Sequence, residues 1–161
     1  QHNVANALVC LAAARHVGVV PELGIAALSA FMNVKRRMEK VAEVRGVTIY
    51  DDFAHHPTAI ATTLDGLRKR IGGARLIAIV EPRSNSMKLG ADHVFWYAPA
   101  NLGWDLAATV ASSTVPTTVC DSLEQIIAAV TALATPGTQI VVMSNGGFGG
   151  LHSKLAEALA E

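Results

Sequence analysis

The chain lacks several features that would assign it to a protein class at once. Its 161 residues contain only two cysteines, no run of Lys or Arg, and a formal net charge of zero. Nucleic-acid backbones are usually bound by a basic stripe, so no nucleic-acid partner is expected. No stretch of about 18 uninterrupted apolar residues is present, so no membrane span is predicted. Residues 1–14 also lack the basic start of a signal peptide.

The two cysteines, Cys10 and Cys120, do not have the spacing of metal ligands. Both lie in apolar runs, which predicts buried thiols of a cytoplasmic protein. With 51% apolar and 16% charged residues, the composition indicates a soluble, core-rich chain of about one domain. The first residue is Gln1 rather than Met, so we expect a piece of a longer protein.

The first third of the chain predicts two helices and a hairpin. Residues 3–17 are rich in Ala, Leu and Val, and Pro21 is a suitable first residue for a second helix that ends near Phe31. Residues 33–40 interrupt the apolar pattern and predict a linker. A hairpin is expected over residues 41–50.

Helical and strand patterns alternate after the hairpin. Pro57 opens a helix whose apolar residues recur every three or four positions, and Gly72-Gly73 ends it. The other expected elements are strands at 76–80, 107–111, 117–120 and 140–143, a helix after a capping box of Asp121 and Glu124, a Gly-rich turn at 144–150 and a last helix from Leu151. This alternation predicts an α/β fold with a mostly parallel sheet and helices on both faces.

Three polar loops follow predicted strands, at residues 51–56, 81–88 and 144–150. Right-handed crossovers place such loops on one edge of the sheet, and ligands of α/β sheets bind at that edge. We therefore expect the three loops to form one site.

The loop 51–56 gathers carboxylates and imidazoles where a strand meets a helix. Asp51 and Asp52 could bind a ribose hydroxyl, a metal or a basic side chain, or could cap the end of the strand. His55 and His56 precede a helix, whose dipole favours neutral imidazole. They could orient an amine or carboxylate, act as a base, or simply cap the helix. Metal ligation is not expected, because adjacent histidines rarely share one ion.

Other candidate residues are basic or glycine-rich. Arg36 and Arg37 could form a solvated turn, or an arginine there could swing onto a nucleotide. Arg83, with Lys88 nearby, follows a strand, and arginine suits carboxylate or phosphate. The backbone amides of residues 145–150 could cradle an anion, or the glycines could allow close packing of helix on strand.

Taken together, several segments resemble motifs of the Mur ligase family, the ATP-dependent amide ligases of bacterial cell-wall synthesis. The segments are His2–Asn6, Arg36–Glu39, Asp51–Thr58, Glu81–Gly90 and Ser144–Leu151. The resemblance covers essentially the whole chain. It implies a Rossmann-like, mostly parallel sheet with flanking helices in residues 36–161, preceded in residues 1–35 by the helical end of a central ATPase domain.

The resemblance also implies which residues bind ATP. Asn6 would contact the adenine, and Phe53 would stack near it. Arg37 and Asp51 would reach the phosphates and the ribose. Mg²⁺ would accompany the nucleotide, with its ligands mainly outside these residues.

A second group of residues is implied to bind the substrates. It consists of His55, His56, Arg83, Lys88 and Asn145. His55 and Arg83 would hold the incoming peptide near its amine or carboxylate. The His-His-Pro form of the motif is similar to that of family members that act directly on UDP-N-acetylmuramate.

The activity that the resemblance implies is the joining of UDP-N-acetylmuramate to L-Ala-γ-D-Glu-meso-diaminopimelate through an acyl phosphate, in peptidoglycan recycling. Ser84–Met87 stands where alanine-adding relatives carry further arginines, which fits a larger acceptor. The family's phosphate-binding loop is not in this sequence, so we expect the N-terminal and central domains to precede it and the chain alone to be inactive. The alternatives are another member, such as an alanine-adding or folylpolyglutamate synthase-like ligase, and a non-catalytic nucleotide- or anion-binding module.

Overall fold

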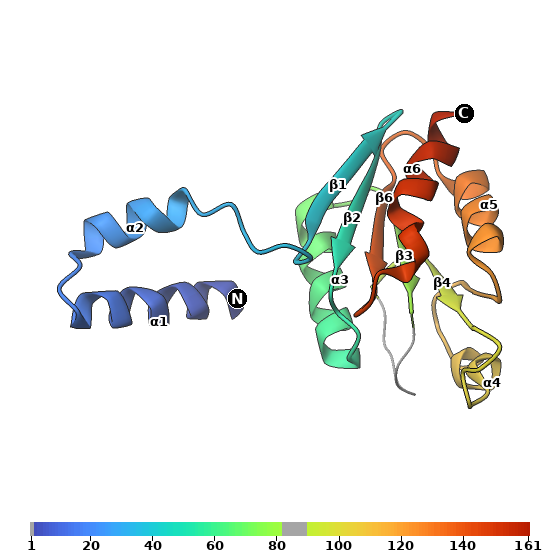
Figure 1. Cartoon of the computed structure of the whole chain (residues 1–161), viewed down its shortest axis with the longest axis horizontal. Coiled ribbons are helices and arrows are strands. Elements are labelled where there is room, and N and C mark those ends of the chain that lie inside the picture. The colour runs from blue at the N-terminus through green and yellow to red at the C-terminus, as the bar shows by residue number, and fades with distance from the viewer. Residues whose placement is uncertain (1, 82–89) are drawn as a thin grey trace. The chain divides into compact units, whose positions relative to one another are not determined.

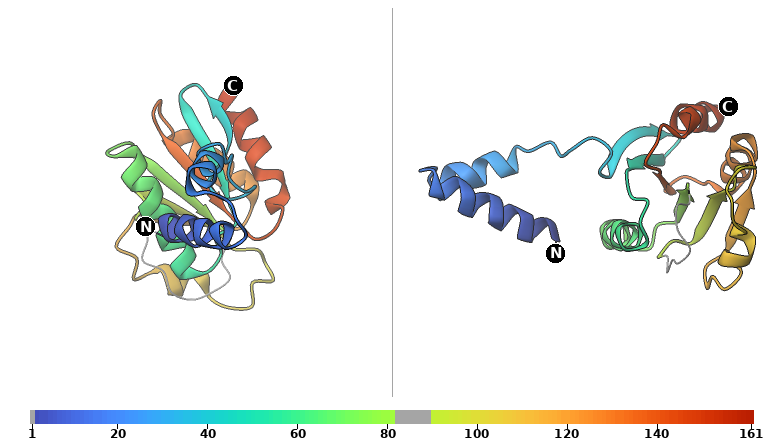
Figure 2. Two further views of the ribbon diagram at one scale, coloured as in Figure 1. Left: turned by 90° about the vertical axis from the view of Figure 1, so that its left-hand side faces the viewer. Right: turned by 60° about the horizontal axis from the view of Figure 1, so that its bottom comes forward.

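The computed structural model describes residues 2–81 and 90–161 and divides the chain into two compact units, residues 1–34 and 35–161. The first unit is a pair of helices, α1 (His2–His16) and α2 (Pro21–Ser29), which lie side by side (Figures 1 and 2). Pro21 is the first helical residue, as predicted, because proline needs no hydrogen bond to its nitrogen there. None of residues 3–34 is buried.

The second unit is a six-stranded sheet in the order β1-β2-β6-β3-β4-β5. Among the strand pairs of the described residues, β1–β2 is antiparallel and the others are parallel. The strands are β1 (Glu39–Val44), β2 (Val47–Asp52), β3 (Leu76–Val80), β4 (His93–Tyr97), β5 (Thr117–Cys120) and β6 (Gln139–Met143). The helices are α3 (Pro57–Ile71), α4 (Leu106–Val110), α5 (Leu123–Leu133), the 3₁₀ turn η1 (Phe148–Gly150) and α6 (Leu151–Ala160). The predicted α/β class, with a mostly parallel sheet and flanking helices, is confirmed.

Alternating strand residues build a hydrophobic core on each face of the sheet. Ile79 and its same-face neighbours pack with α5 and α6. Val80 and its neighbours pack with α3 and α4. Figure 1 shows α3 on one side of the sheet and α5 and α6 on the other. Every residue of β3 is buried, as expected for a parallel strand covered on both faces.

Local sequence signals fix the segments that border the site. The β1–β2 hairpin turns at Arg45 and Gly46, which both have positive φ, as a tight two-residue turn requires. His56 is the N-cap of α3, and Pro57 follows it at the first helical position. Gly72, with φ of 60°, ends the helix. The predicted hairpin and helix are confirmed.

Several expectations are wrong. Residues 107–111 are not a strand but lie in and just after α4, which Asp105 caps by accepting a hydrogen bond from the Ala108 backbone nitrogen at 2.9 Å. The strand β4 was not predicted from the sequence. The predicted linker 33–40 overlaps the start of β1, which begins at Glu39. The N-cap of α5 is Ser122 rather than Asp121.

Of the two thiols predicted to be buried, Cys120 is buried and Cys10 is exposed. Cys10 lies on α1, in the unit that has no buried residue among residues 3–34. Its apolar sequence neighbours therefore do not bury it.

Candidate functional site

The candidate site lies at the carboxyl ends of the three adjacent strands β2, β6 and β3. Met143 ends β6 and pairs in register with Asp52 on one side and Val80 on the other. The Ser144 backbone nitrogen then donates to the Asp52 carbonyl at 3.2 Å, and the Glu81 backbone nitrogen donates to the Met143 carbonyl at 3.0 Å. The loops after these strands therefore start from one place, as predicted for their described parts.

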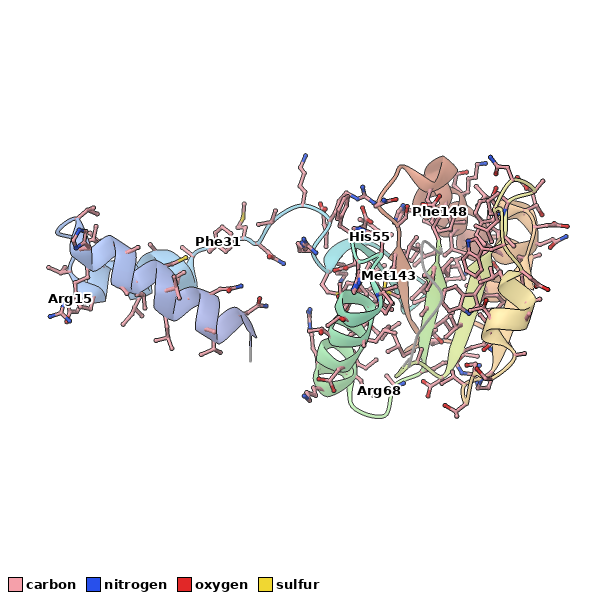
Figure 3. The ribbon with its side chains drawn as sticks, turned by 90° about the horizontal axis from the view of Figure 1, so that it is seen from below. Arg15, Phe31, His55, Arg68, Met143 and Phe148 are labelled. Atoms are coloured by element: carbon pink, nitrogen blue, oxygen red, sulfur yellow. The ribbon has the colours of Figure 1, made fainter. Side chains whose placement is uncertain are left out.

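Figure 3 shows that His55 and Arg68 lie at opposite ends of α3. His55 belongs to the end that faces the carboxyl edge of the sheet, directly after β2. Arg68 lies in the last turn, where it contacts the loop before β3 through the Ala74 carbonyl at 2.7 Å. Arg68 is therefore remote from the candidate site, whereas His55 lies at it.

Asp52 is a structural carboxylate. Only 2% of its surface is exposed. Its Oδ2 accepts from the Met38 backbone nitrogen at 2.9 Å, and its Oδ1 accepts from the Ala54 backbone nitrogen at 2.8 Å and from the Thr63 hydroxyl at 3.3 Å. This residue takes the strand-end capping role that was one of the two sequence-based alternatives.

Asp51 instead pairs with basic side chains. Its Oδ2 accepts from Arg36 Nε at 3.1 Å, and its Oδ1 lies 3.3 Å from His152 Nε2. The side chains of Asp51 and His152 are 14% and 19% exposed. Burial lowers the pKa of His152 below its ordinary value, an effect that the nearby Asp51 carboxylate opposes and the Arg36 guanidinium adds to. His152 was not among the predicted site residues, and its place beside the Gly-rich segment was the one local signal for it.

Two arginines surround Phe53. The guanidinium carbons of Arg36 and Arg37 lie 5.2 Å and 5.9 Å from the centre of its ring, within the range of cation–π contacts. The Phe53 backbone nitrogen donates to the Arg36 carbonyl at 2.8 Å. His55 completes the cluster with an edge-on ring contact to Phe53 at 5.4 Å. The alternative that Arg36 belongs to a solvated basic turn is therefore wrong, because its side chain is only 29% exposed.

The two histidines have different local roles. His56 caps α3, since its Nδ1 accepts a long hydrogen bond of 3.4 Å from the Thr58 backbone nitrogen. His55 Nδ1 lies 3.0 Å from the Phe53 carbonyl. A carbonyl can only accept, so His55 carries its proton on Nδ1 in that bond, and its Nε2 is an acceptor when the ring is neutral.

The Gly-rich segment after β6 is tied to β3 as well as to β2. The Ser144 hydroxyl donates to Glu81 Oε2 at 2.5 Å and accepts from the Gly146 backbone nitrogen at 2.9 Å. Asn145, between them, is half-buried. Phe148 is buried against Tyr97, with ring centres 5.6 Å apart. Glu81 was missed as a site residue, because only the folded sheet brings it to Ser144.

The predicted site residues thus divide into three sets. One set gathers at this edge of the sheet; it consists of Arg37, Asp51, Phe53, His55, His56 and Asn145. Asn6 lies on α1, in the other unit. Arg83 and Lys88 lie outside the described residues.

The described part of this edge offers no cluster of side chains with the composition of a metal site. Within residues 2–81 and 90–161, no group of three or more His, Cys, Asp and Glu side chains could hold a metal. Asp52 accepts three hydrogen bonds, and Asp51 accepts one from Arg36 while its Oδ1 lies near His152 Nε2. The geometry suits binding of a polar organic ligand by cationic, aromatic and imidazole groups. None of the helices that the structure describes is long and apolar enough to span a membrane.

Known proteins are similar to this chain in both sequence and fold. The chain is 47% identical to the UDP-N-acetylmuramate–L-alanyl-γ-D-glutamyl-meso-2,6-diaminoheptandioate ligase of Escherichia coli K12, over 100% of the chain and 38% of that protein. A crystal structure of a murein peptide ligase from Psychrobacter arcticus superposes with a TM-score of 0.78 and 46% identity, over 99% of this chain and 37% of that one. The chain therefore spans well under half the length of these relatives.

A UDP-N-acetylmuramate–L-alanine ligase from Ruegeria pomeroyi is 49% identical, but over only 53% of this chain and 18% of that protein. The family model described as Mur ligase, glutamate ligase domain, matches residues 36–146. These residues run from the arginines beside Phe53 to the Gly-rich segment after β6, and so include most of the edge described above. On this match, the chain belongs to the Mur ligase family.

Proposed function

We propose that the chain is the C-terminal lobe of a longer ATP-dependent ligase that joins UDP-N-acetylmuramate to L-Ala-γ-D-Glu-meso-diaminopimelate. One observation carries this proposal: the identity with the E. coli ligase of that name, 47%, extends over the whole chain, whereas the match to the alanine ligase covers about half. Residues 1–35 would be the end of the central ATPase domain, and residues 36–161 the acceptor-binding domain. The phosphate-binding loop and the Mg²⁺ ligands would lie elsewhere in the protein.

The proposed reaction has two steps. The muramoyl carboxylate attacks the γ-phosphorus of ATP, which gives an acyl phosphate and ADP. The tripeptide amine then attacks the acyl carbon, and phosphate leaves to give the amide. Bound Mg²⁺ would offset the charge of the phosphates. The residues of this lobe would bind and orient the nucleotide and the amine.

On the nucleotide side, the support comes from the cluster around Phe53. Arg37 and Phe53 present a guanidinium and an aromatic ring beside each other, which suits a nucleotide with its anionic phosphates and flat base. Asp51 would serve the ribose from a carboxylate whose Oδ2 is held by Arg36 and whose buried Oδ1 lies 3.3 Å from His152 Nε2 without a hydrogen bond to it. Asn6 belongs to the other unit, and the adenine contact that the family resemblance implies for it stays a prediction.

On the acceptor side, His55 is the residue with suitable chemistry. With its Nδ1 proton donated to the Phe53 carbonyl, Nε2 of the neutral ring can accept a hydrogen bond or a proton from the attacking amine. His56 and Asn145 lie at the same carboxyl edge of the sheet. Arg83 and Lys88 lie outside the described residues, and the substrate contacts that the resemblance implies for them stay predictions.

The test is ATP-dependent phosphate release by the full-length protein with UDP-N-acetylmuramate and either the tripeptide or free L-alanine. We expect release that requires the tripeptide. Release with L-alanine alone would assign the protein to the alanine-adding branch. If neither acceptor supports release, the chain belongs to a non-catalytic binding module or to a ligase of another acceptor.

Two substitutions in the full-length protein distinguish the proposed nucleotide-binding residues from the proposed acceptor-binding residues. Arg37→Ala is expected to raise the KM for ATP about tenfold, and His55→Asn to raise the KM for the tripeptide by a similar factor, because each removes a contact to a charged partner. Lys69→Ala is the control, since Lys69 is exposed on α3 and pairs only locally with Asp65. Equal effects of Arg37→Ala and His55→Asn on both KM values would contradict the division.

A further inference from the structure

Arg36 has a backbone conformation that arginine seldom adopts. Its φ is 58°, in the left-handed region that glycine occupies without strain. Two hydrogen bonds hold it there. Its backbone nitrogen donates to Glu39 Oε2 at 2.8 Å, and its carbonyl accepts from the Phe53 backbone nitrogen at 2.8 Å. A glycine could make both backbone bonds, so the backbone alone does not account for an arginine at this position.

The side chain of Arg36 joins two segments that are far apart in sequence. Its Nη2 donates to the carbonyls of Ser144 and Gly146, at 2.6 Å and 2.8 Å, and its Nε donates to Asp51 at 3.1 Å. The guanidinium thus connects the end of β2 to the first turn after β6. The guanidinium reaches these three acceptors from two nitrogens held in one plane, whereas the three N–H donors of a lysine ammonium share one nitrogen and cannot reproduce this fork.

The segment that Arg36 holds is also the one that carries Asn145. Among the described residues, its other hydrogen bonds at this edge run through Ser144. The Ser144 hydroxyl bonds to Glu81 and to the Gly146 backbone nitrogen, and the Ser144 backbone nitrogen donates to the Asp52 carbonyl of β2 at 3.2 Å. Arg36 adds the bonds to the Ser144 and Gly146 carbonyls. Without Arg36, the Gly146 carbonyl would lose its bond on the β2 side, and among the described residues the Ser144 backbone nitrogen alone would still tie the segment to β2.

We propose that Arg36 is a positioning residue of the ligase, which holds residues 144–147 and the Asp51 carboxylate in the arrangement that the reaction uses. The proposal rests on the proposed function for its effect on ligation. Its structural half, the anchoring of residues 144–147, is independent of which acceptor the enzyme takes.

The experiment compares Arg36→Gly, Arg36→Lys and Arg45→Gly in the full-length protein. Arg45 is the matched control, because it is also left-handed, with φ of 48°, but lies exposed in the β1–β2 turn. Hydrogen exchange of peptides covering residues 144–150 measures the anchoring. We expect faster exchange there in both Arg36 variants and not in Arg45→Gly. We also expect kcat/KM for ligation to fall about tenfold to about a hundredfold, because small displacements of positioning groups are costly.

Unchanged exchange in residues 144–150 of both Arg36 variants would overturn the proposal, whatever the activity. Faster exchange with wild-type kcat/KM would overturn the claim that the anchoring matters for ligation. A loss of kcat/KM that matches a loss of folded protein, read from the melting curve, would reduce Arg36 to a stability role. If the wild-type protein ligates neither acceptor, the proposed function fails, and the exchange comparison still decides whether Arg36 holds the segment.

Discussion

The two units of the chain differ in the burial of their large apolar side chains. In the described part of residues 35–161 these side chains fill two cores, and the exposed ones are Val41 and Val119. In residues 3–34, no side chain is buried. The exposed large apolar residues there are Val4, Leu8, Val9, Val17, Val20, Leu23, Ile25, Phe31, Met32 and Val34. In Figure 3, the labelled Arg15 and Phe31 both project outward from their segments.

The difference follows from the number of residues in each unit and from the number of layers of secondary structure that pack together in it. A pair of helices in some 30 residues can bury little more than the line along which they touch, so it has no independent core. A sheet with helices on both faces encloses apolar side chains in two layers. The sheet unit should therefore be stable by itself, and the helix pair should depend on other parts of a longer chain to cover it.

The largest expected effect comes from a pair of apolar substitutions. Ile79→Ala removes a fully buried side chain from the central strand β3 and is expected to lower the free energy of unfolding by about 2–5 kcal/mol. Leu8→Ala removes a side chain that is 63% exposed and is expected to change it by less than about 0.5 kcal/mol.

Denaturant unfolding followed by circular dichroism reports both units, and tryptophan fluorescence reports residues 35–161, which contain Trp96 and Trp104. A loss of similar size in Ile79→Ala and Leu8→Ala would show that α1 is packed against something in the isolated chain. The contrast between the two units would then be wrong.

Two glycines give a smaller and more specific contrast. A Cβ at Gly149, before α6, would lie 2.6 Å from Leu123 Cδ1, and a Cβ at Gly24, in α2, would lie 2.6 Å from Leu11 Cδ2. Gly149 has φ of 57°, whereas Gly24 lies within a helix. Gly149→Ala should therefore destabilise by about 1–2 kcal/mol, and Gly24→Ala should be close to neutral, because alanine favours the helix and Leu11 can move.

Thermal unfolding of the two alanine variants measures this difference. Equal losses would mean that the close approach to leucine, which the two sites share, dominates over backbone handedness. Little loss in Gly149→Ala would mean that the turn before α6 can adopt another backbone conformation.

The parts of the fold that the sequence predicted are those with strong local signals. The helix after Pro57 has one apolar stripe, a proline at its start and a glycine at its end, and the buried strands β3 and β6 are short apolar runs. The helix α4 was mistaken for a strand because a short apolar run carries no decisive period. The cap at Asp105 was the signal that should have decided the assignment.

The sequence predicts where in the fold the candidate site lies, but it does not predict which of its side chains contact each other. The order of strands and helices indicates that the loops after β2, β3 and β6 share an edge. It does not indicate that Arg36 bonds across 108 positions to Ser144, that His152 meets Asp51, or that Glu81 accepts from Ser144. Such contacts depend on the twist of the sheet and on side-chain rotamers, which local patterns do not encode.

The smallest expected effect concerns pH and the His152–Asp51 pair. Because burial lowers the pKa of His152 below 6.5, the unfolded chain binds the proton more readily than the folded chain. Stability contributed by the neutral imidazole is therefore fully present above pH 6.5 and is lost as the pH falls through 6.5 towards the lower folded value. The charged groups that face His152 are Asp51, Arg36 and Glu39, of which the two carboxylates oppose the lowering.

The measurement is the free energy of unfolding of the wild-type chain and of His152→Gln across this pH range. One histidine contributes a slope of at most about 1.4 kcal/mol per pH unit, so the difference between the two proteins is modest. We expect the wild type to lose stability relative to His152→Gln as the pH falls. The opposite sign would mean that Asp51 and Glu39 outweigh burial, so that His152 is an imidazolium in the folded protein. In that case Asp51 would be held between two cations, and its carboxylate would be less available to a ribose than the proposed site requires.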